Sequence, residues 1–398
     1  MTVEYRPPRN EAELEDAFAC TARAFGGGLS FFTNIVKYDP WFCLDNARAC
    51  FVDGKVVSLV QIFERPMRIG NCVVRMGGVG SVGTDPAYRR AGHSMNVLRD
   101  SVEYMKAEGY DLSILFTGIP SHYGKAGWVV HPVYSVRLTL PEALREVQTE
   151  CQIELCDLAR DLPDLMAIYD AFNAARTGTT VRTEIYWNQQ PKWREYDPAM
   201  FWVAKRNSRT VAYLKAGRWS LNELGYVNGE EAAAMALCVY FFRQAQAEAV
   251  KEVESRCPLA CCEMFEALGC AVRRREGGGT MVQVIDLKSL LAKVTPLLEA
   301  RLHASGFSAW TGAICVRYEA DERMLSIQNG KITVSPGGVS PNIDLVVSQA
   351  QLLRLLFGSM RAEDIAFSNR LALREDEIGL LNALFPPDEL FLWGTDGF

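Results

Sequence analysis

The chain has 398 residues, of which 49% are hydrophobic and 23% charged, and its formal net charge is -6. This length fits two or three domains, and this composition is that of a folded globular protein rather than a disordered or fibrous one. The acidic balance argues against nucleic acid as the main partner, because binding to phosphates requires a basic surface, and it mildly favours cationic substrates.

The compartment is predicted from three absences. The segment from Met1 to Ala17 has no apolar core, so we expect no secretory signal, and the longest apolar run, Ala232 to Phe242, is too short to cross a bilayer. The 12 cysteines are scattered without paired CxxC spacing, so we expect reduced, mostly buried thiols and no metal site. We therefore expect a cytoplasmic protein without membrane or metal partners.

The first predicted elements are a helix and a hairpin. Apolar residues at helical spacing predict a helix over Glu11 to Phe25, which glycines 26 to 28 end, and we expect a loop after them. Asp53-Gly54 separates two strand-like runs, Ala49 to Val52 and Lys55 to Phe63, and this spacing predicts a β-hairpin.

The next elements are a strand, a turn, a helix and a strand. The stretch Cys72 to Val82 is β-patterned, and its glycines at 77, 78 and 80 indicate a bulge or the close approach of a ligand. Apolar spacing predicts a helix from Ser94, which ends at Gly109, and Leu112 to Phe116 reads as a buried strand.

Two further α/β regions follow. For about 145 to 285 the predicted elements are a helix near Leu162 to Phe172, strands Phe201 to Ala204 and Val211 to Leu214, and a helix Arg243 to Glu254. For the remainder they are a helix Leu287 to Ala300, a hairpin at Asn329-Gly330, a strand Ile343 to Val347, and helices Gln349 to Leu356 and Ile378 to Leu384.

The segment Val82 to Ser94 joins the glycine-containing strand to the next helix. The first amides of a helix have no partners within it and lie at the positive end of the helix dipole. A diphosphate placed there gains hydrogen bonds from these amides and charge from Arg89 and Arg90, and Gly92 allows its close approach. A surface turn that merely contains two arginines is the alternative.

The pattern Arg89-x-x-Gly92-x-Ser94 resembles the coenzyme A motif of GNAT acyltransferases, with serine in place of the usual final glycine or alanine. The resemblance implies acetyl-CoA as co-substrate, with the strand end beside the pantetheine arm and the turn around the diphosphate. The coenzyme-binding residues that it implies are Ser81, Val82, Gly83, Thr84, Arg89, Arg90, Ala91, Gly92, His93 and Ser94.

The segment Tyr123-Gly-Lys-Ala-Gly-Trp128 resembles the Y-x-x-x-G-F sequence that closes many GNAT domains. The resemblance implies that Tyr123 protonates the departing coenzyme thiolate. A phenol with an ordinary pKa of about 10 is protonated at neutral pH and suits this role. A core tyrosine whose hydroxyl binds a backbone group is the alternative.

Over nearly its full length the chain resembles the Eis-like (enhanced intracellular survival) GNAT acetyltransferases, with supporting residues at Ala24 to Gly28, Ser368 to Leu371 and the terminal phenylalanine. The implied fold is α/β (α+β), with two tandem GNAT-like domains and a sterol-carrier-protein-like domain. The implied spans are 1–144 for the catalytic GNAT domain, 145–285 for a degenerate GNAT-like domain and 286–398 for the sterol-carrier-like domain. The middle span has no second coenzyme motif, and the resemblance also implies a homo-oligomer, a hexamer.

In this subfamily the C-terminal carboxylate accepts a proton from the substrate amine, which implies that role for Phe398. An α-carboxylate with a pKa of about 3.5 is ionised at neutral pH. The apolar run Leu390 to Trp393 favours docking of the tail, and a frayed terminus is the alternative.

We therefore expect an acetyl-CoA-dependent N-acetyltransferase that acts on a small-molecule primary amine. The resemblance to the Eis-like enzymes suggests an aminoglycoside or a polyamine as candidate acceptors. The sequence does not fix the acceptor, the acyl-chain preference or any lipid binding by the third domain. The rivals are a non-catalytic protein that holds a hydrophobic ligand in the sterol-carrier-like domain, and a transferase of other acyl groups.

Overall fold

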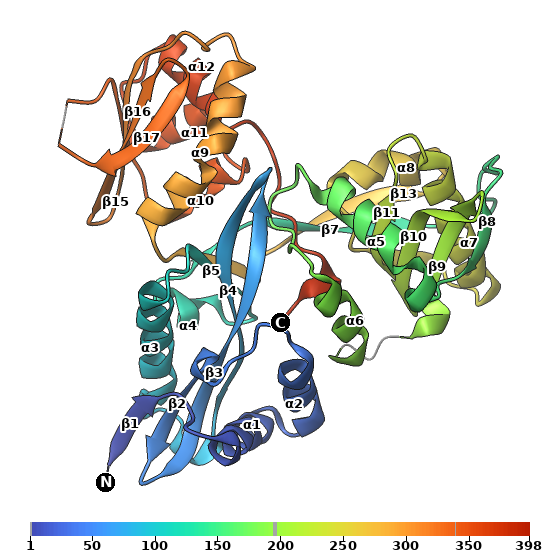
Figure 1. The fold of residues 1–398 in the computed structure, drawn as a ribbon, viewed down its shortest axis with the longest axis horizontal. Helices are drawn as coiled ribbons and strands as arrows, with labels where there is room; N and C mark the ends of the chain where they lie inside the picture. Colours follow the sequence, from blue (N-terminus) through green and yellow to red (C-terminus); the bar gives the residue numbers. More distant parts are fainter. Residues whose placement is uncertain (1, 194–196, 339) are drawn as a thin grey trace.

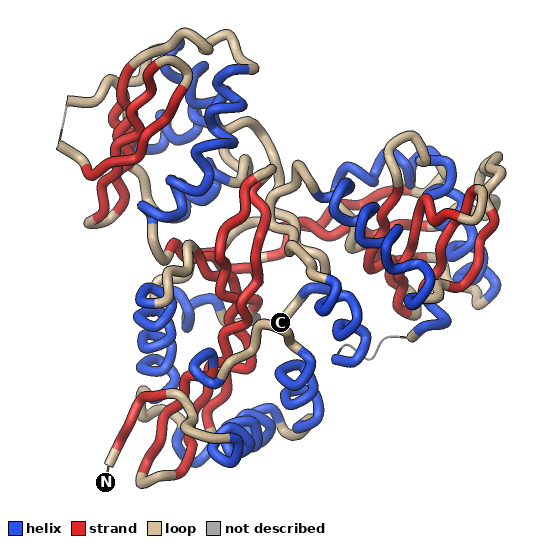
Figure 2. Tube along the Cα trace, viewed as in Figure 1, coloured by secondary structure: helices blue, strands red, loops and turns tan. Residues whose placement is uncertain are grey.

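The computed structural model describes residues 2–193, 197–338 and 340–398, which form three sheets. Figure 1 shows three lobes, with the C-terminus returning to the lobe that carries the N-terminus. Figure 2 shows that helices cover the sheets in each lobe. The chain therefore ends far from the lobe that contains most of its last hundred residues.

The first sheet has the strand order β1-β2-β3-β4-β5-β14-β6. Its strands are β1 (Val3–Arg6), β2 (Ala47–Val52), β3 (Lys55–Ile69), β4 (Cys72–Thr84), β5 (Leu112–Phe116), β6 (Val129–Val130) and β14 (Thr280–Val284). Its helices are α1 (Glu11–Phe25), α2 (Leu29–Tyr38), α3 (His93–Ala107) and α4 (Pro120–Gly124). The helix predicted over Glu11 to Phe25, the hairpin at Asp53-Gly54 and the strand Leu112 to Phe116 are confirmed.

The second sheet has the order β13-β7-β12-β11-β10-β9-β8. Its strands are β7 (Val133–Thr139), β8 (Gln152–Leu155), β9 (Phe201–Arg206), β10 (Arg209–Gly217), β11 (Ser220–Tyr226), β12 (Glu252–Ser255) and β13 (Ala271–Gly277). Its helices are α5 (Leu158–Asn173), α6 (Glu184–Trp193), α7 (Glu231–Ala247) and α8 (Cys262–Ala267).

The helix predicted over Arg243 to Glu254 is wrong, because α7 ends at Ala247 and Glu252–Ser255 is strand β12. The apolar run Ala232 to Phe242 supplies the buried face of α7, which packs on β10. The helix α7 therefore begins and ends earlier in the sequence than predicted, because its apolar residues are the ones that must be buried against the sheet.

Two strands cross between the first and second sheets. β7 pairs with β12 and β13 of the second sheet, whereas β14 returns to pair with β5 and β6 of the first. The spans 1–144 and 145–285 therefore each lend one strand to the other's sheet.

The third sheet has the order β17-β16-β15-β18. Its elements are β15 (Gly312–Tyr318), β16 (Asp321–Gln328), β17 (Lys331–Pro336), β18 (Ile343–Val346), α9 (Leu287–His303), α10 (Gln349–Leu356), α11 (Ala362–Asn369) and α12 (Glu375–Leu384). The hairpin at Asn329-Gly330 is confirmed. One buried cluster joins α9 to β4 and β5, so the third region shares its core with the first sheet.

All 12 cysteines carry free thiols. Across 2–193, 197–338 and 340–398, no helix combines the length and apolarity needed to cross a bilayer.

Candidate active site

β4 separates from β5 partway along its length. Residues Met76 to Val79 pair in parallel with β5, whereas the rest of β4 pairs only with β3. A bulge places Ser81 and Val82 opposite the single residue Val60, so neither has a partner in register. A bulge removes backbone groups from the hydrogen-bond ladder of the sheet, and here the Ser81 carbonyl accepts instead from Thr21 Oγ1 at 3.4 Å.

A cavity of about 450 Å³ lies between the end of β4 and the start of α3. Six of the predicted coenzyme-binding residues line it: Thr84, Arg89, Arg90, Gly92, His93 and Ser94. No aspartate or glutamate is among its lining residues in the described part of the chain.

The backbone before α3 suits an anion. Arg90 and Gly92 have positive φ angles of 66° and 82°, and no side chain caps the first amides of α3. Successive amides in such a turn, at the positive end of a helix, make a concave site for phosphate. The residues present therefore fit the diphosphate of a coenzyme.

The other predicted coenzyme residues are placed differently. Ser81 lines a second cavity, and Val82 packs against the core of the first sheet. Gly83 is buried against Thr21 of α1, and Ala91 is exposed in the turn.

The ring of His93 is engaged in the core. It is 7% exposed, and its Nδ1 lies 3.2 Å from the Tyr5 hydroxyl and 3.3 Å from Cys50 Sγ. Its place at the first position of α3 leaves its backbone amide as the group that can face a phosphate.

His122 lines the same cavity and was missed by the sequence reasoning. Its Nε2 lies 3.1 Å from Ser94 Oγ, which links α4 to the start of α3. Burial and the charge of Lys125 lower the pKa of His122, so its ring is neutral at pH 7. Its position directly before Tyr123 was the available signal.

Tyr123 lies in α4 and is 9% exposed. Burial raises the pKa of its phenol, and a hydrogen bond with Thr117 opposes that rise in part. The phenol is therefore protonated at neutral pH, as a proton donor must be.

Phe398 reaches the first sheet at the point where β4 and β5 separate. Its ring lies 6.0 Å from that of Phe63 on β3 and 5.3 Å from that of Phe116 on β5. A β-carbon on Gly78 would come within 2.6 Å of this ring, and one on Gly80 would lie 3.1 Å from the carboxylate carbon of Phe398. The absence of side chains at Gly78 and Gly80 thus leaves the space that Phe398 occupies.

A buried ionic cluster holds the tail just before Phe398. The short helix η5 (Gly394–Asp396) carries Asp396, which accepts hydrogen bonds from Arg182 Nε at 2.8 Å and from the Tyr186 hydroxyl at 2.9 Å. The other two nitrogens of Arg182 bind both carboxylate oxygens of Glu223 at 2.8 Å. The sequence offers no signal for this cluster, because its members are far apart along the chain.

A smaller cavity, of about 310 Å³, lies beside Phe398. The loop predicted after Gly28 is wrong from Leu29 onward, because α2 begins there and buries Phe32, Ile35 and Val36. The cavity is lined by Phe25, Gly27, Gly28, Phe31, Phe32, Ile35, Ser81 and Phe398. Apart from Ser81, the lining residues are glycines or have apolar side chains, and none has a carboxylate side chain.

The comparisons with known proteins agree with this architecture. Residues 4–131 match the acetyltransferase (GNAT) domain family. No curated protein sequence matches the chain.

Similar solved structures extend over the whole chain. A probable N-acyltransferase from Enterococcus faecalis V583 has a TM-score of 0.76 at 16% identity, and a GCN5-related N-acetyltransferase from Anabaena variabilis has 0.72 at 16%, each with full coverage of both chains. Eis1 from Mycobacterium abscessus has a TM-score of 0.67 at 18% identity, again with full coverage of both chains.

Identities this low establish the fold alone. The predicted fold class is confirmed, with tandem GNAT-like α/β regions followed by a further α/β region. The domain match and this fold support an acyltransferase as the general class of the protein.

Proposed function

We propose that this chain is an acetyl-CoA-dependent N-acetyltransferase of the Eis type that acetylates a primary amine with an apolar body. The observation that supports this proposal is the cavity at the start of α3, which adjoins the separated strands β4 and β5 where Phe398 docks.

The coenzyme would bind in the positions that the sequence motif suggests. The amides of the first turn of α3 and the side chains of Arg89 and Arg90 would bind its diphosphate. The unpaired amides near Val82 would polarise the thioester carbonyl.

Direct attack by the amine would follow. The Phe398 carboxylate takes a proton from the ammonium form of the substrate, directly or through water, and the free amine attacks the thioester carbon. The C–N bond forms, the nitrogen of the adduct loses its second proton to solvent, the C–S bond breaks, and Tyr123 gives its proton to the coenzyme sulfur. The Phe398 carboxyl group then releases its proton to solvent. The amide and free coenzyme A leave, and the tyrosinate recovers a proton from solvent.

The acceptor class follows from the cavity beside Phe398. Polycations such as aminoglycosides and polyamines are bound through carboxylates, whereas the side chains here are Phe25, Phe31, Phe32 and Ile35. We therefore propose an amine with one cationic end, at the Phe398 carboxylate, and an aromatic or aliphatic body.

The three spans would divide the work. Span 1–144 would carry the chemistry, and 145–285 would fix the tail through Arg182 and Glu223. Span 286–398 would be a sterol-carrier-like scaffold, in a cytoplasmic hexamer. The observation that disfavours a purely lipid-binding protein is the docking of Phe398 at the coenzyme side of the first sheet.

The proposal is tested by release of coenzyme A thiol from acetyl-CoA in the presence of phenethylamine, spermidine and an aminoglycoside. We expect turnover with phenethylamine to exceed that with the two polycations. A variant with two glycines appended after Phe398 should lose most of this turnover. Unchanged turnover in that variant would remove the carboxylate from the mechanism, and no thiol release with any amine would contradict the acetyltransferase assignment.

A further inference from the structure

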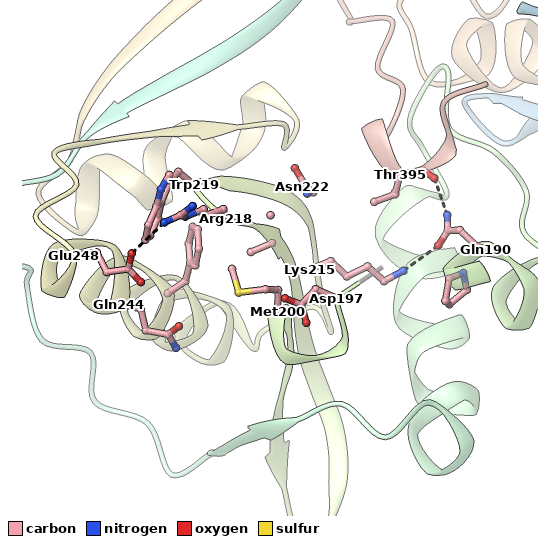
Figure 3. A pocket seen from close by; sticks show the side chains of 14 residues that line it. Gln190, Asp197, Met200, Lys215, Arg218, Trp219, Asn222, Gln244, Glu248 and Thr395 are labelled. Atoms are coloured by element: carbon pink, nitrogen blue, oxygen red, sulfur yellow. Dashed lines mark hydrogen bonds and ion pairs between the residues drawn. The ribbon is translucent and has the colours of Figure 1, made fainter. Parts of the chain in front are cut away.

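A separate cavity of about 460 Å³ lies in the second α/β region (Figure 3). It is bounded by the end of β10, the start of β11, the C-terminal half of α7 and residues of α6. Thr395 of the tail also contributes to its lining. Nothing in the proposed acetyl transfer uses this cavity.

Lys215 is the buried cation of the cavity. Its side chain is 8% exposed, and its Nζ donates to Gln190 Oε1 at 3.2 Å, as Figure 3 shows. The same nitrogen lies 3.9 Å from Glu223 and 4.4 Å from the centre of the Trp187 ring. Among the described residues, the Lys215 ammonium group therefore makes one hydrogen bond, whereas an ammonium group can donate three.

Glu223 does not neutralise Lys215 fully, because other groups already hold its carboxylate. Arg182 binds both of its oxygens at 2.8 Å, the Tyr213 hydroxyl donates at 2.9 Å, and Thr395 Oγ1 donates to it as well. A carboxylate engaged in this way has little remaining capacity for a second cation.

The ionisation of Lys215 reflects its burial. Burial lowers its pKa to about 8, and the attraction of Glu223 opposes that effect only in part. The titratable groups that act on it are Glu223, Arg182, Asp396 and Cys156, and those elsewhere along the cavity are Asp197, Arg218 and Glu248.

The opposite part of the cavity has an apolar wall. Trp219, Phe241 and Met200 contribute it, as the close view shows for Trp219 and Met200. At that end Arg218 and Glu248 face each other at 3.9 Å, so their charges are partly balanced. The cavity therefore has a buried cation that is only partly balanced by Glu223 at one end and a flat apolar surface at the other.

We propose that this cavity binds a small organic carboxylate, with its charge at Lys215 and its flat apolar body against Trp219 and Phe241. Such a ligand would give Lys215 a second hydrogen-bond acceptor beside Gln190 and would cover the half-buried ring of Trp219. The inference stands apart from the acetyltransferase proposal, because none of its residues contacts the cavity at the start of α3.

Calorimetry on the full chain tests the proposal with a matched pair of probes, 2-naphthoate and its neutral amide, 2-naphthamide. At pH 7 we expect naphthoate to bind at least about tenfold more tightly, because a hydrogen bond to a charged group is stronger than one to a neutral group. The preference should shrink at pH 9.5, where Lys215 with a pKa of about 8 is mostly uncharged, and the affinity for the amide should stay constant.

Variants assign the binding to this cavity. Lys215→Met should abolish the preference for naphthoate, whereas Lys251→Met, which removes an exposed lysine of the same region, should leave it intact. Trp219→Ala should weaken both probes and provides a second readout if Lys215→Met fails to fold, which its thermal unfolding curve will reveal. Equal affinity for the two probes, no binding at millimolar concentration, or a naphthoate preference that survives Lys215→Met in the folded variant would overturn the proposal.

Discussion

Two glycines of β4 leave space that Phe398 fills. Gly78 faces the ring of Phe398, and Gly80 faces the Phe63 ring and the carboxylate carbon of Phe398. Neither glycine has a positive φ angle, so the absence of a side chain, rather than backbone freedom, is what each position requires.

Gly78→Ala tests the docking of the tail. The new methyl group would lie within 2.6 Å of the Phe398 ring, so the ring must move. If the carboxylate of Phe398 acts on the amine, we expect kcat to fall about 100-fold, since a shift of about 1 Å has that cost. Gly306→Ala is the control, because a β-carbon there meets nothing within 4 Å. Equal kcat in the two variants would contradict the account.

Tyr123→Phe tests the proton donor. Removal of the hydroxyl should lower kcat about 100-fold, because general acid catalysis contributes on that scale, with little change in the affinity for acetyl-CoA. Tyr104→Phe deletes a hydroxyl that binds Asn46 in the same sheet region and should leave kcat close to that of the wild type. A Tyr123→Phe enzyme with full turnover would show that the phenol is only part of the core.

Among individual residues, part of the candidate site could be predicted from the sequence. The motif Arg89 to Ser94 and Tyr123 could be chosen because their chemistry depends on short local spacing. His122, Arg182 and Asp396 could not be assigned, because their positions depend on how distant segments pack. The glycines of β4 signalled a close approach, but only the structure shows that Phe398 makes it.

Among the elements, η5 joins the second region to the first. Its Asp396 is 4% exposed and pairs with Arg182, which is itself buried, so the tail is fixed two residues before its end. Removing one partner of a buried ion pair leaves the other charge uncompensated.

Asp396→Asn should therefore lower the free energy of unfolding by about 3 kcal/mol. If Asp396 positions Phe398, kcat should fall while the affinity for acetyl-CoA, measured by calorimetry, stays unchanged. Asp376→Asn, on the exposed start of α12, is the control for loss of a carboxylate. If the Asp396→Asn variant lost stability but kept its full kcat, Asp396 would have a structural role only.

Element prediction succeeded where one pattern dominated and failed where tertiary packing decided. The period of α1 and the turn residues Asn329-Gly330 are local signals, and both predictions are confirmed. The segments α2 and β12 were missed or misassigned, because their identity depends on the surfaces against which they pack.

For the whole molecule, the buried ionic cluster predicts how stability responds to acid. Burial alone would raise the pKa of Glu223, but Arg182 and Lys215 lower it to about 2, whereas a glutamate in the unfolded chain has a pKa of about 4.3. Its folded pKa is the lower one, so its contribution is complete above the unfolded value and is lost as the pH falls from about 4 towards about 2.

Urea unfolding at pH 6, 4 and 3 measures this contribution. The wild type should lose stability across this range more steeply than Glu223→Gln, which has no carboxyl group to protonate at that position. Parallel pH dependence in the two proteins would show that Glu223 titrates normally.

In the whole molecule, the C-terminal tail of span 286–398 docks on the sheet of span 1–144 and is held there by residues of span 145–285. The proposed acetyltransferase function depends on whether the turn before α3 binds a coenzyme. The most direct measurement is a calorimetric titration of the full chain with acetyl-CoA, alongside an Arg89→Ala/Arg90→Ala variant. The account predicts saturable binding by the wild type, weakened at least about tenfold in the variant. No heat of binding at millimolar acetyl-CoA, or equal affinity in the two proteins, would contradict it.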